Sequence, residues 1–252
     1  RGKWICWLSS DDLFMPNKLE THLLGFMAHP GTYVFHTGYS VLHEESAMLV
    51  PVGLPEGFLP PEELQVLKFF QVNYFNGITI CIHRSVFNRV GSFNTSLRNG
   101  QDFDMWLRIS AIYRSQYVSE RTSISREHPE QGSSISSDAG IFDSALSSLN
   151  FLNRHRFEDI FPSLDLSQSD HAGHAIQNSL KILVNPSAYI NTCGYGIALL
   201  ARMREWAGLP ENRDNIVFLK RALFEDLVAA LIQTEIPSSM KESFSFFFRA
   251  VG

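Results

Sequence analysis

The sequence predicts an α/β fold over residues 1–137, followed by an all-helical extension over residues 138–252. Two observations support this division. Up to about residue 135, segments rich in β-branched and aromatic residues alternate with segments of helical periodicity, as expected for an α/β domain. Beyond that point strand signals are nearly absent, and apolar residues recur at helical spacing.

The strands of the first part are predicted from short apolar runs. Residues 4–8 form a continuous apolar run, which is typical of a buried strand. Residues 32–43 are rich in β-branched and aromatic residues, and residues 78–83 repeat this pattern. Residues 115–126 are expected to contain one or two short strands. The segment 51–61 holds four prolines and two glycines and is predicted to be a loop.

The helices of the first part separate these strands. The first is predicted over residues 16–28 and closed by the His-Pro-Gly sequence that follows it. A short helix follows at 62–71 and a helical turn at 85–90, which Gly91 ends as a structural residue. Residues 102–113 carry apolar side chains at helical spacing and complete the set.

The second part contains helical segments alone. Apolar periodicity predicts five of them, over residues 140–157, 171–184, 189–207, 214–233 and 238–250.

Bulk composition limits the possible partners. The chain has 252 residues, 44% of them hydrophobic, enough for one large domain or a domain with an extension. A net charge of −5 gives no basic footprint for nucleic acid. Since no apolar run reaches about 18 residues, we expect no membrane-spanning segment. Cys6, Cys81 and Cys193 are scattered and odd in number, so we expect reduced core thiols in a cytoplasmic protein.

Two adjacent carboxylates, Asp11 and Asp12, follow the first predicted strand. Like charges this close repel each other and shift each other's pKa, and a divalent cation removes that cost. Mg²⁺ or Mn²⁺ is coordinated by carboxylate oxygens and, at the same time, by oxygens of substrate phosphates. The pair therefore predicts either a metal-assisted phosphate site or an ordinary turn that caps the next helix.

A second acidic stretch follows Gly100, where Asp102 and Asp104 open a predicted helix. Acidic residues are favoured there by the helix dipole, so simple capping is one interpretation. The other is that Asp102 acts as a general base, with Asp104 and Arg108 as supports.

Histidines add one further candidate. His128 follows a predicted strand on a polar loop, where a neutral imidazole can complete a metal site begun by Asp11 and Asp12. His22, His29, His36 and His43 recur every seven residues, but this spacing crosses a helix, a turn and a strand. It therefore predicts no common ligand set.

Four pieces together resemble a known family. They are W-L-S-S-D-D-L-F-M-P-N-K-L-E, G-I-T-I-C-I-H-R-S-V-F-N-R-V-G-S-F-N, G-Q-D-F-D-M-W-L-R and R-E-H-P-E-Q-G-S, in that order. Their order and spacing resemble the second half of a family 2 glycosyltransferase catalytic domain of the GT-A fold. The resemblance covers roughly residues 1–135.

The resemblance implies roles for individual residues. Asp11 and Asp12 stand where the family's Asp-x-Asp motif holds the donor's metal and ribose, with Ser9 in place of the first acid. Asp12 is then the metal ligand, Asp11 a donor-binding residue, and His128 a further metal ligand. Asp102 is the catalytic base, because Gln101 replaces a residue that is often Glu in the family and cannot accept a proton.

Donor binding is further assigned to two residues. Gly77 opens the strand on the acceptor side, and Arg108 supports the helix of the base. The implied reaction is inverting transfer of a sugar from a nucleoside diphosphate, UDP in the first instance, to an acceptor hydroxyl. The metal is Mg²⁺ or Mn²⁺, the acceptor a saccharide or a lipid-linked group, and the setting polysaccharide or glycoconjugate synthesis.

In the family, a nucleotide-base-binding half precedes the first strand seen here. We therefore expect a truncated GT-A domain that is inactive alone. The alternative is a non-catalytic carbohydrate-binding or interaction module derived from such an enzyme. A metal-dependent phosphohydrolase is disfavoured, because further His and Asp ligands at helix or strand spacing are missing from the sequence.

Overall fold

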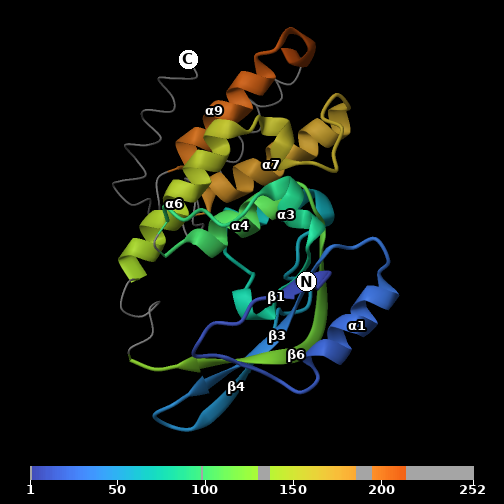
Figure 1. Cartoon of the computed structure of the whole chain (residues 1–252). Coiled ribbons are helices and arrows are strands. Elements are labelled where there is room, and N and C mark those ends of the chain that lie inside the picture. Colours follow the sequence, from blue (N-terminus) through green and yellow to red (C-terminus); the bar gives the residue numbers. More distant parts are fainter. Residues whose placement is uncertain (1, 98, 130–136, 186–194, 214–252) are drawn as a thin grey trace.

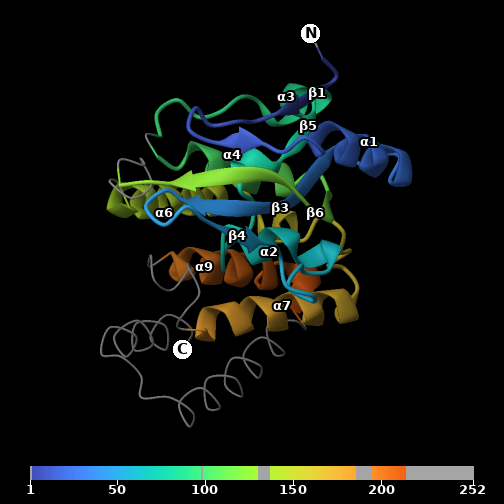
Figure 2. The ribbon, with the colours of Figure 1, turned by 90° about the horizontal axis from the view of Figure 1, so that it is seen from below.

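A computed structural model describes residues 2–97, 99–129, 137–185 and 195–213. In this part of the chain, a mixed, curled sheet carries helices on its faces (Figure 1). Helices α3 and α4 lie between the sheet and a group of three longer helices. Figure 2 shows the same arrangement from below, with α7 and α9 side by side and away from β1. The α/β class predicted for the first part is confirmed.

The sheet is antiparallel except at its centre. Its order is β1-β5-β3-β6-β2, and β4 pairs with β3 outside this path. The two long strands β3 and β6 run parallel, and their register shifts on both sides of Gly38. A Cβ on Gly38 would lie 3.2 Å from the Val52 carbonyl oxygen, so the chains pass closely there. The strands are β1 Trp4–Cys6, β2 Leu13–Phe14, β3 Val34–His43, β4 Met48–Val52, β5 Cys81–His83 and β6 Ser115–Glu127.

Seven α-helices lie in the described part of the chain. They are α1 Lys18–Ala28, α2 Gln65–Phe69, α3 Ser85–Val90, α4 Gln101–Ser110, α6 Ser137–Arg154, α7 Ser169–Val184 and α9 Gly196–Ala207. Short 3₁₀ turns cover Glu62–Leu64, Gly77–Thr79, Phe157–Ile160 and Pro210–Asn212. Among the described residues, no helix is long and apolar enough to cross a membrane.

Several sequence predictions need correction. Residues 115–126 form most of a single 13-residue strand, because β6 pairs along the whole length of β3. The predicted loop 51–61 begins inside β4, a strand that the sequence did not predict. Proline is tolerated there because, among the described strands, β4 pairs with β3 alone, and Pro51 therefore lies at a sheet edge. The predicted helices 214–233 and 238–250 lie outside the described residues.

The first strand is less buried than its apolar sequence predicts. β1 covers only Trp4–Cys6, and it lies at the edge of the described sheet with β5 as its partner. Ile5 is 40% exposed. An apolar run alone does not distinguish a central strand from an edge strand, which explains the difference.

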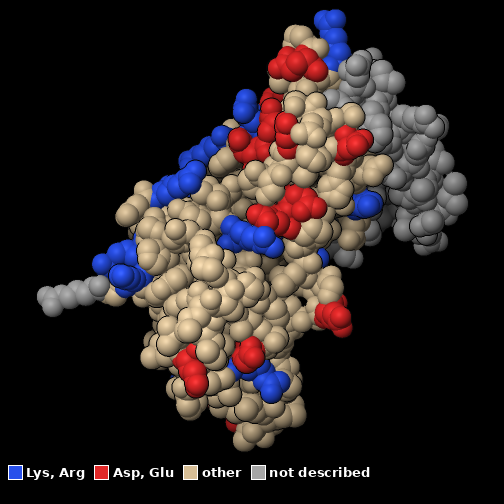
Figure 3. Space-filling view, turned by 90° about the vertical axis from the view of Figure 1, so that its right-hand side faces the viewer, with Lys and Arg blue, Asp and Glu red and all other residues tan. Residues whose placement is uncertain are grey.

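Helix α1 has an inverted polarity. Its inward face carries Lys18, Thr21, His22 and Gly25, and Gly25 allows the helix to approach Phe35 closely. Its outward face carries exposed leucines and a methionine. This region contributes to a surface with few charged side chains in the lower half of Figure 3. The outward residues are Leu19, Leu23, Leu24 and Met27.

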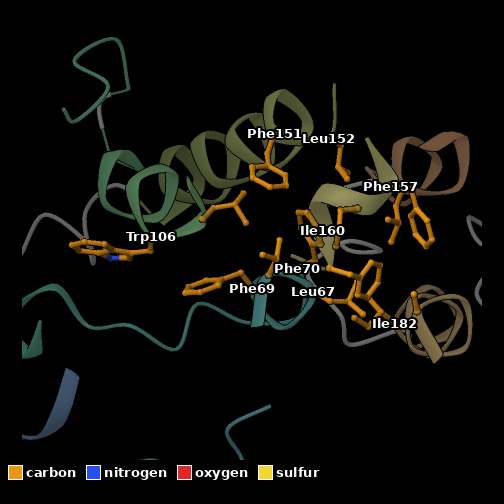
Figure 4. Packing of buried hydrophobic residues seen from close by; sticks show 14 of the residues in the cluster. Leu67, Phe69, Phe70, Trp106, Phe151, Leu152, Phe157, Ile160 and Ile182 are labelled. Carbon is orange, nitrogen blue, oxygen red and sulfur yellow. The ribbon is translucent and has the colours of Figure 1, made fainter. Parts of the chain in front are cut away.

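The core runs without interruption from the sheet into the later helices. Figure 4 shows Leu67 and Phe69 of α2, and Phe70 just after it, beside Phe151 and Leu152 of α6, with Ile182 of α7 nearby. Residues on both sides of position 137 thus belong to one hydrophobic cluster. The boundary between residues 137 and 138 stays a prediction. The helices after it pack onto the α/β part through this shared core.

A buried amide joins the end of α4 to the start of β6. Gln65 Nε2 donates to the carbonyl oxygens of Ser110 at 3.3 Å and Tyr113 at 2.9 Å. Its Oε1 accepts from the backbone N–H of Ser115 at 3.1 Å and from the Ser115 hydroxyl at 3.0 Å. The amide nitrogen and the amide oxygen of Gln65 therefore both hold the turn between α4 and β6.

Candidate functional site

The loop after β1 brings Asp11 and Asp12 beside the last residues of β6. Directly after Asp12, β2 pairs with β6, with Leu13 opposite Ile124. The backbone N–H of Asp12 donates to the Ser9 carbonyl oxygen at 3.3 Å and closes a tight turn. The short β2 pairing therefore determines where the two carboxylates lie.

Arg126 binds both aspartates through different groups. Its backbone N–H donates to Asp12 Oδ1 at 3.0 Å, and its Nε donates to the Asp11 carbonyl oxygen. Its Nη1 forms an ion pair with Glu44 Oε1 at 3.2 Å. Asp12 is 9% exposed, so this carboxylate is held in place by the end of β6.

Asp11 faces His128. The distance from His128 Nε2 to Asp11 Oδ2 is 3.3 Å, and both side chains are partly buried. A neutral imidazole and a carboxylate at this distance form either a hydrogen bond or two ligands of one cation. The sequence predicted that these residues, 117 positions apart, share one site, and the structure brings them together.

This arrangement fits a hard divalent cation in part. Mg²⁺ is usually held by one or two carboxylates and completes its shell with water and substrate phosphates. Asp11 and His128 offer an oxygen and a nitrogen, whereas Asp12 Oδ1 already accepts from Arg126. Asp12, Asp11 and His128 do not converge as three close ligand atoms in the described part of the chain. The assignment of Asp12 and His128 as metal ligands stays a prediction.

Asp102 lies in the first turn of α4, as predicted. Its Oδ1 accepts from the backbone N–H of Phe103 at 2.7 Å. Burial raises the pKa of this carboxyl above its ordinary value, while the backbone hydrogen bonds act in the opposite direction. A raised pKa makes a carboxylate a stronger base, which suits proton transfer. The catalytic role of Asp102 stays a prediction.

Arg108 has a structural environment. Its Nη2 and Nε donate to Asp104 Oδ2 at 2.7 and 2.9 Å. Its Nη1 donates to the Val90 carbonyl oxygen at 2.7 Å, and its Nη2 also reaches the Ser92 carbonyl oxygen at 3.1 Å. These contacts hold α4 to the turn at Gly91, where φ is +85°. Direct donor binding by Arg108 stays a prediction, and it would compete with these hydrogen bonds.

Gly77 begins a 3₁₀ turn before β5. A Cβ at this position would lie 3.8 Å from Trp7 and 3.9 Å from Trp106, which is ordinary contact. Packing therefore does not require glycine here, and its role in donor binding stays a prediction. Trp7 follows β1, and its ring centroid lies 4.7 Å from that of Phe93.

Sequence reasoning missed two residues of this region. Arg126 was part of a quoted motif but received no role, although it binds both aspartates. Its position two residues before His128 was the available signal. Trp7 had no signal beyond its place in an apolar run, because its packing against Phe93 joins distant parts of the chain.

Comparisons with known proteins support a glycosyltransferase. The chain is 29% identical over 136 residues to an uncharacterized glycosyltransferase of Rickettsia felis, covering 53% of this chain and 22% of that protein. It is 31% identical over 119 residues to one of Rickettsia typhi, covering 45% of this chain and 37% of the relative. A Haemophilus influenzae protein of the same description is 26% identical over 111 residues, covering 43% of this chain and 36% of its own length.

The chain thus spans well under half the length of these relatives. No family model matches it.

Proposed function

We propose that this chain carries part of the catalytic domain of an inverting, metal-dependent glycosyltransferase of family 2, with a GT-A fold. The observation that carries the proposal is the contact between Asp11 and His128 at 3.3 Å, beside Asp12 held by Arg126. The names of the relatives support glycosyl transfer in general. The sugar donor and the acceptor of the whole protein are also part of this proposal.

The donor side is assigned to the loop after β1 and the end of β6. Asp11 and His128 offer ligands to Mg²⁺ or Mn²⁺, and Asp12 is available through the oxygen that Arg126 does not bind. When bound, the cation would neutralise charge on the leaving diphosphate. Arg126 keeps both aspartates in register with His128 through its backbone and side-chain donors.

The acceptor side is assigned to the start of α4. Asp102 takes the proton of the acceptor hydroxyl as the oxygen attacks the anomeric carbon and the bond to the diphosphate breaks. A single displacement inverts the anomeric configuration. Burial raises the pKa of Asp102, which makes its carboxylate a stronger base for this transfer. The donor is a nucleoside-diphosphate sugar, UDP-linked in the first instance, and the acceptor is a saccharide or a lipid-linked group.

The test of the base is a donor screen on the complete native polypeptide, with released nucleoside diphosphate as the readout. Asp102→Asn is expected to lose transfer by about 100-fold or more while it retains donor binding. Asp170→Asn is the matched control, since Asp170 also lies in the first turn of a helix but is exposed. Transfer by Asp102→Asn at the wild-type rate would refute the assignment.

The donor side is tested separately by calorimetry with donor and Mn²⁺. Asp12→Ala, Asp11→Ala and His128→Ala are each expected to weaken metal-dependent donor binding. Unchanged binding in all three variants would exclude the metal assignment. Saccharide binding without donor turnover in the native polypeptide would favour the alternative, a non-catalytic module.

A further inference from the structure

We infer that Cys6, His22 and Cys81 form a second metal site, which takes a thiophilic d¹⁰ cation such as Zn²⁺ or Cu⁺. This cluster is separate from the site of Asp11 and His128 and from the proposed transfer reaction. It joins β1, α1 and β5 on the inward face of α1.

The three ligand atoms converge. Cys6 and Cys81 stand directly opposite each other in the antiparallel pair of β1 and β5. Their Sγ atoms are 3.2 Å apart, and a ring nitrogen of His22 lies within 4.8 Å of both. In the described part of the chain, this is the one group of three His, Cys, Asp or Glu ligand atoms that lie so close together. Thiolate and imidazole are ligands that Zn²⁺ and Cu⁺ prefer.

His22 provides independent support. The residue is 2% exposed, and neither ring nitrogen has a hydrogen-bond partner among the described residues. A buried polar group without a partner is unfavourable, and such groups in native proteins often indicate a bound ion or water. Burial lowers the pKa of His22 to about 4, with a contribution from the charge of Lys18. The ring is therefore neutral at pH 7, which is the form that binds metals.

Lys18 lies beside the two thiols. Its Nζ donates to the Ile78 carbonyl oxygen at 2.8 Å and to the hydroxyls of Thr122 and Ser123 at 3.4 and 3.3 Å. A hydrogen bond with Cys81 is the largest effect that lowers the pKa of Cys6 to about 7, and the charge of Lys18 adds to it. The hydrogen bond with Cys6 and burial raise the pKa of Cys81, so the cation must displace the proton of that thiol. The positive charge of Lys18 opposes a cation, but two thiolates carry twice that charge with the opposite sign.

Binding is a simple exchange of protons for metal. The two thiols release two protons to solvent, and the cation forms two bonds to sulfur and one to nitrogen. Zn–S bonds of about 2.3 Å at tetrahedral angles place two sulfurs about 3.8 Å apart, so the pair must separate by roughly half an ångström. Zn²⁺ completes its shell with water, whereas Cu⁺ is satisfied by three soft ligands.

The test uses the 252-residue chain, reduced and freed of metal, with Co²⁺ as a spectroscopic probe. One equivalent of Co²⁺ is expected to give thiolate-to-metal charge-transfer absorption, and one equivalent of Zn²⁺ should abolish it. Cys6→Ser, Cys81→Ser and His22→Gln should each weaken Zn²⁺ binding by more than about 100-fold, beyond the loss typical of an outer-sphere change.

Matched controls separate binding from folding. His29→Gln changes an exposed histidine just after the same helix, and Cys193→Ser removes the third cysteine. Both are expected to bind like wild type, and far-ultraviolet circular dichroism checks that every variant is folded. A parallel titration with Cu⁺ under anaerobic conditions shows which cation binds more tightly.

Three results would overturn the inference. These are absence of charge-transfer absorption in the folded wild type, wild-type binding in folded His22→Gln, and conversion of the two thiols to a disulfide with no metal uptake. Each is independent of glycosyl transfer, so failure of the proposed function leaves this test intact.

Discussion

Asp143 Oδ2 on α6 accepts a hydrogen bond from the backbone N–H of Asn99 at 2.8 Å. The same oxygen lies 3.3 Å from the backbone nitrogen of Gly100, the residue that precedes α4. Helix α4 has no side-chain cap of its own at this position. The Asp143 carboxylate therefore accepts hydrogen bonds from the two backbone N–H groups that precede α4, the helix whose first turn contains Asp102.

Replacement of Asp143 by Ala is expected to lower the free energy of unfolding by about 1–2 kcal/mol, as loss of a capping carboxylate does. Asp143→Asn should lose less stability, because the amide oxygen of the new side chain can still accept these hydrogen bonds. Asp170→Ala, on the exposed first turn of α7, is the control and should change stability by less than about 0.5 kcal/mol. Urea denaturation measures all three. Equal values for Asp143→Ala and Asp170→Ala would contradict this role.

Gly100 has no room for a side chain. A Cβ there would lie 2.7 Å from the Asp143 Cβ and 3.1 Å from its carbonyl carbon, so α4 and α6 would have to separate. Gly100→Ala is expected to cost about 1–3 kcal/mol. Gly140→Ala is the opposite case, because nothing lies within 4 Å of its Cβ inside α6. It should stabilise by about 0.5–1 kcal/mol. Thermal unfolding compares the two, and the same sign for both would refute the steric argument.

Acid is expected to destabilise the fold through His36. This residue is 1% exposed, and burial lowers its pKa from 6.5 to about 3. The unfolded chain binds a proton below pH 6.5 and the folded chain does not, so stability is complete above pH 6.5 and falls toward pH 3. At about 1.4 kcal/mol for each pKa unit, the loss is on the order of 5 kcal/mol.

Urea midpoints between pH 7 and pH 3 measure this loss. The aromatic neighbours of His36, Phe75 and Tyr117, favour Phe as the replacement. His36→Phe should make the pH profile shallower but not flat, because burial also lowers the pKa of His22, to about 4. His29→Gln should keep the wild-type slope. A profile of His36→Phe as steep as that of wild type would assign the acid sensitivity to other groups.

The outward leucines of α1 are expected to contribute little to stability. Leu19 is 76% exposed, and Leu23 is also exposed. Leu19→Lys and Leu23→Lys should each change the free energy of unfolding by less than about 0.5 kcal/mol and reduce binding of a hydrophobic dye. Phe35→Ala, at a fully buried position facing the same helix, should cost about 3–5 kcal/mol. A large loss in either leucine variant would show that this face is covered in solution.

Local patterns predicted the order of elements well but not their environment. The helix over 16–28 and the turn ended by Gly91 were recognised because glycine, proline and apolar spacing act locally. The polarity of α1 was not predicted. Gly25 and the hydrogen bonds of Lys18 determine which face of this helix meets the sheet, and neither effect is visible in local patterns. β4 was missed because its Pro51 locally predicts a loop, whereas the strand forms through its pairing with β3.

The candidate site shows the same division. The sequence predicted that Asp11 and His128 lie close together, and they are in contact. Their role as a donor and metal site stays a prediction. No signal in the sequence indicated the meeting of Cys6, His22 and Cys81, since this depends on strand register and on the rotation of α1. Periodicity does not show which residues from different elements come into contact.

Gln65 links the two elements that carry Asp102 and His128. Asp102 lies at the start of α4, and His128 follows the end of β6. The turn between these two elements is held where Gln65 binds Ser110, Tyr113 and Ser115. Because β6 is fixed along β3, loosening this turn would shift α4, and with it Asp102, relative to His128 without altering either residue.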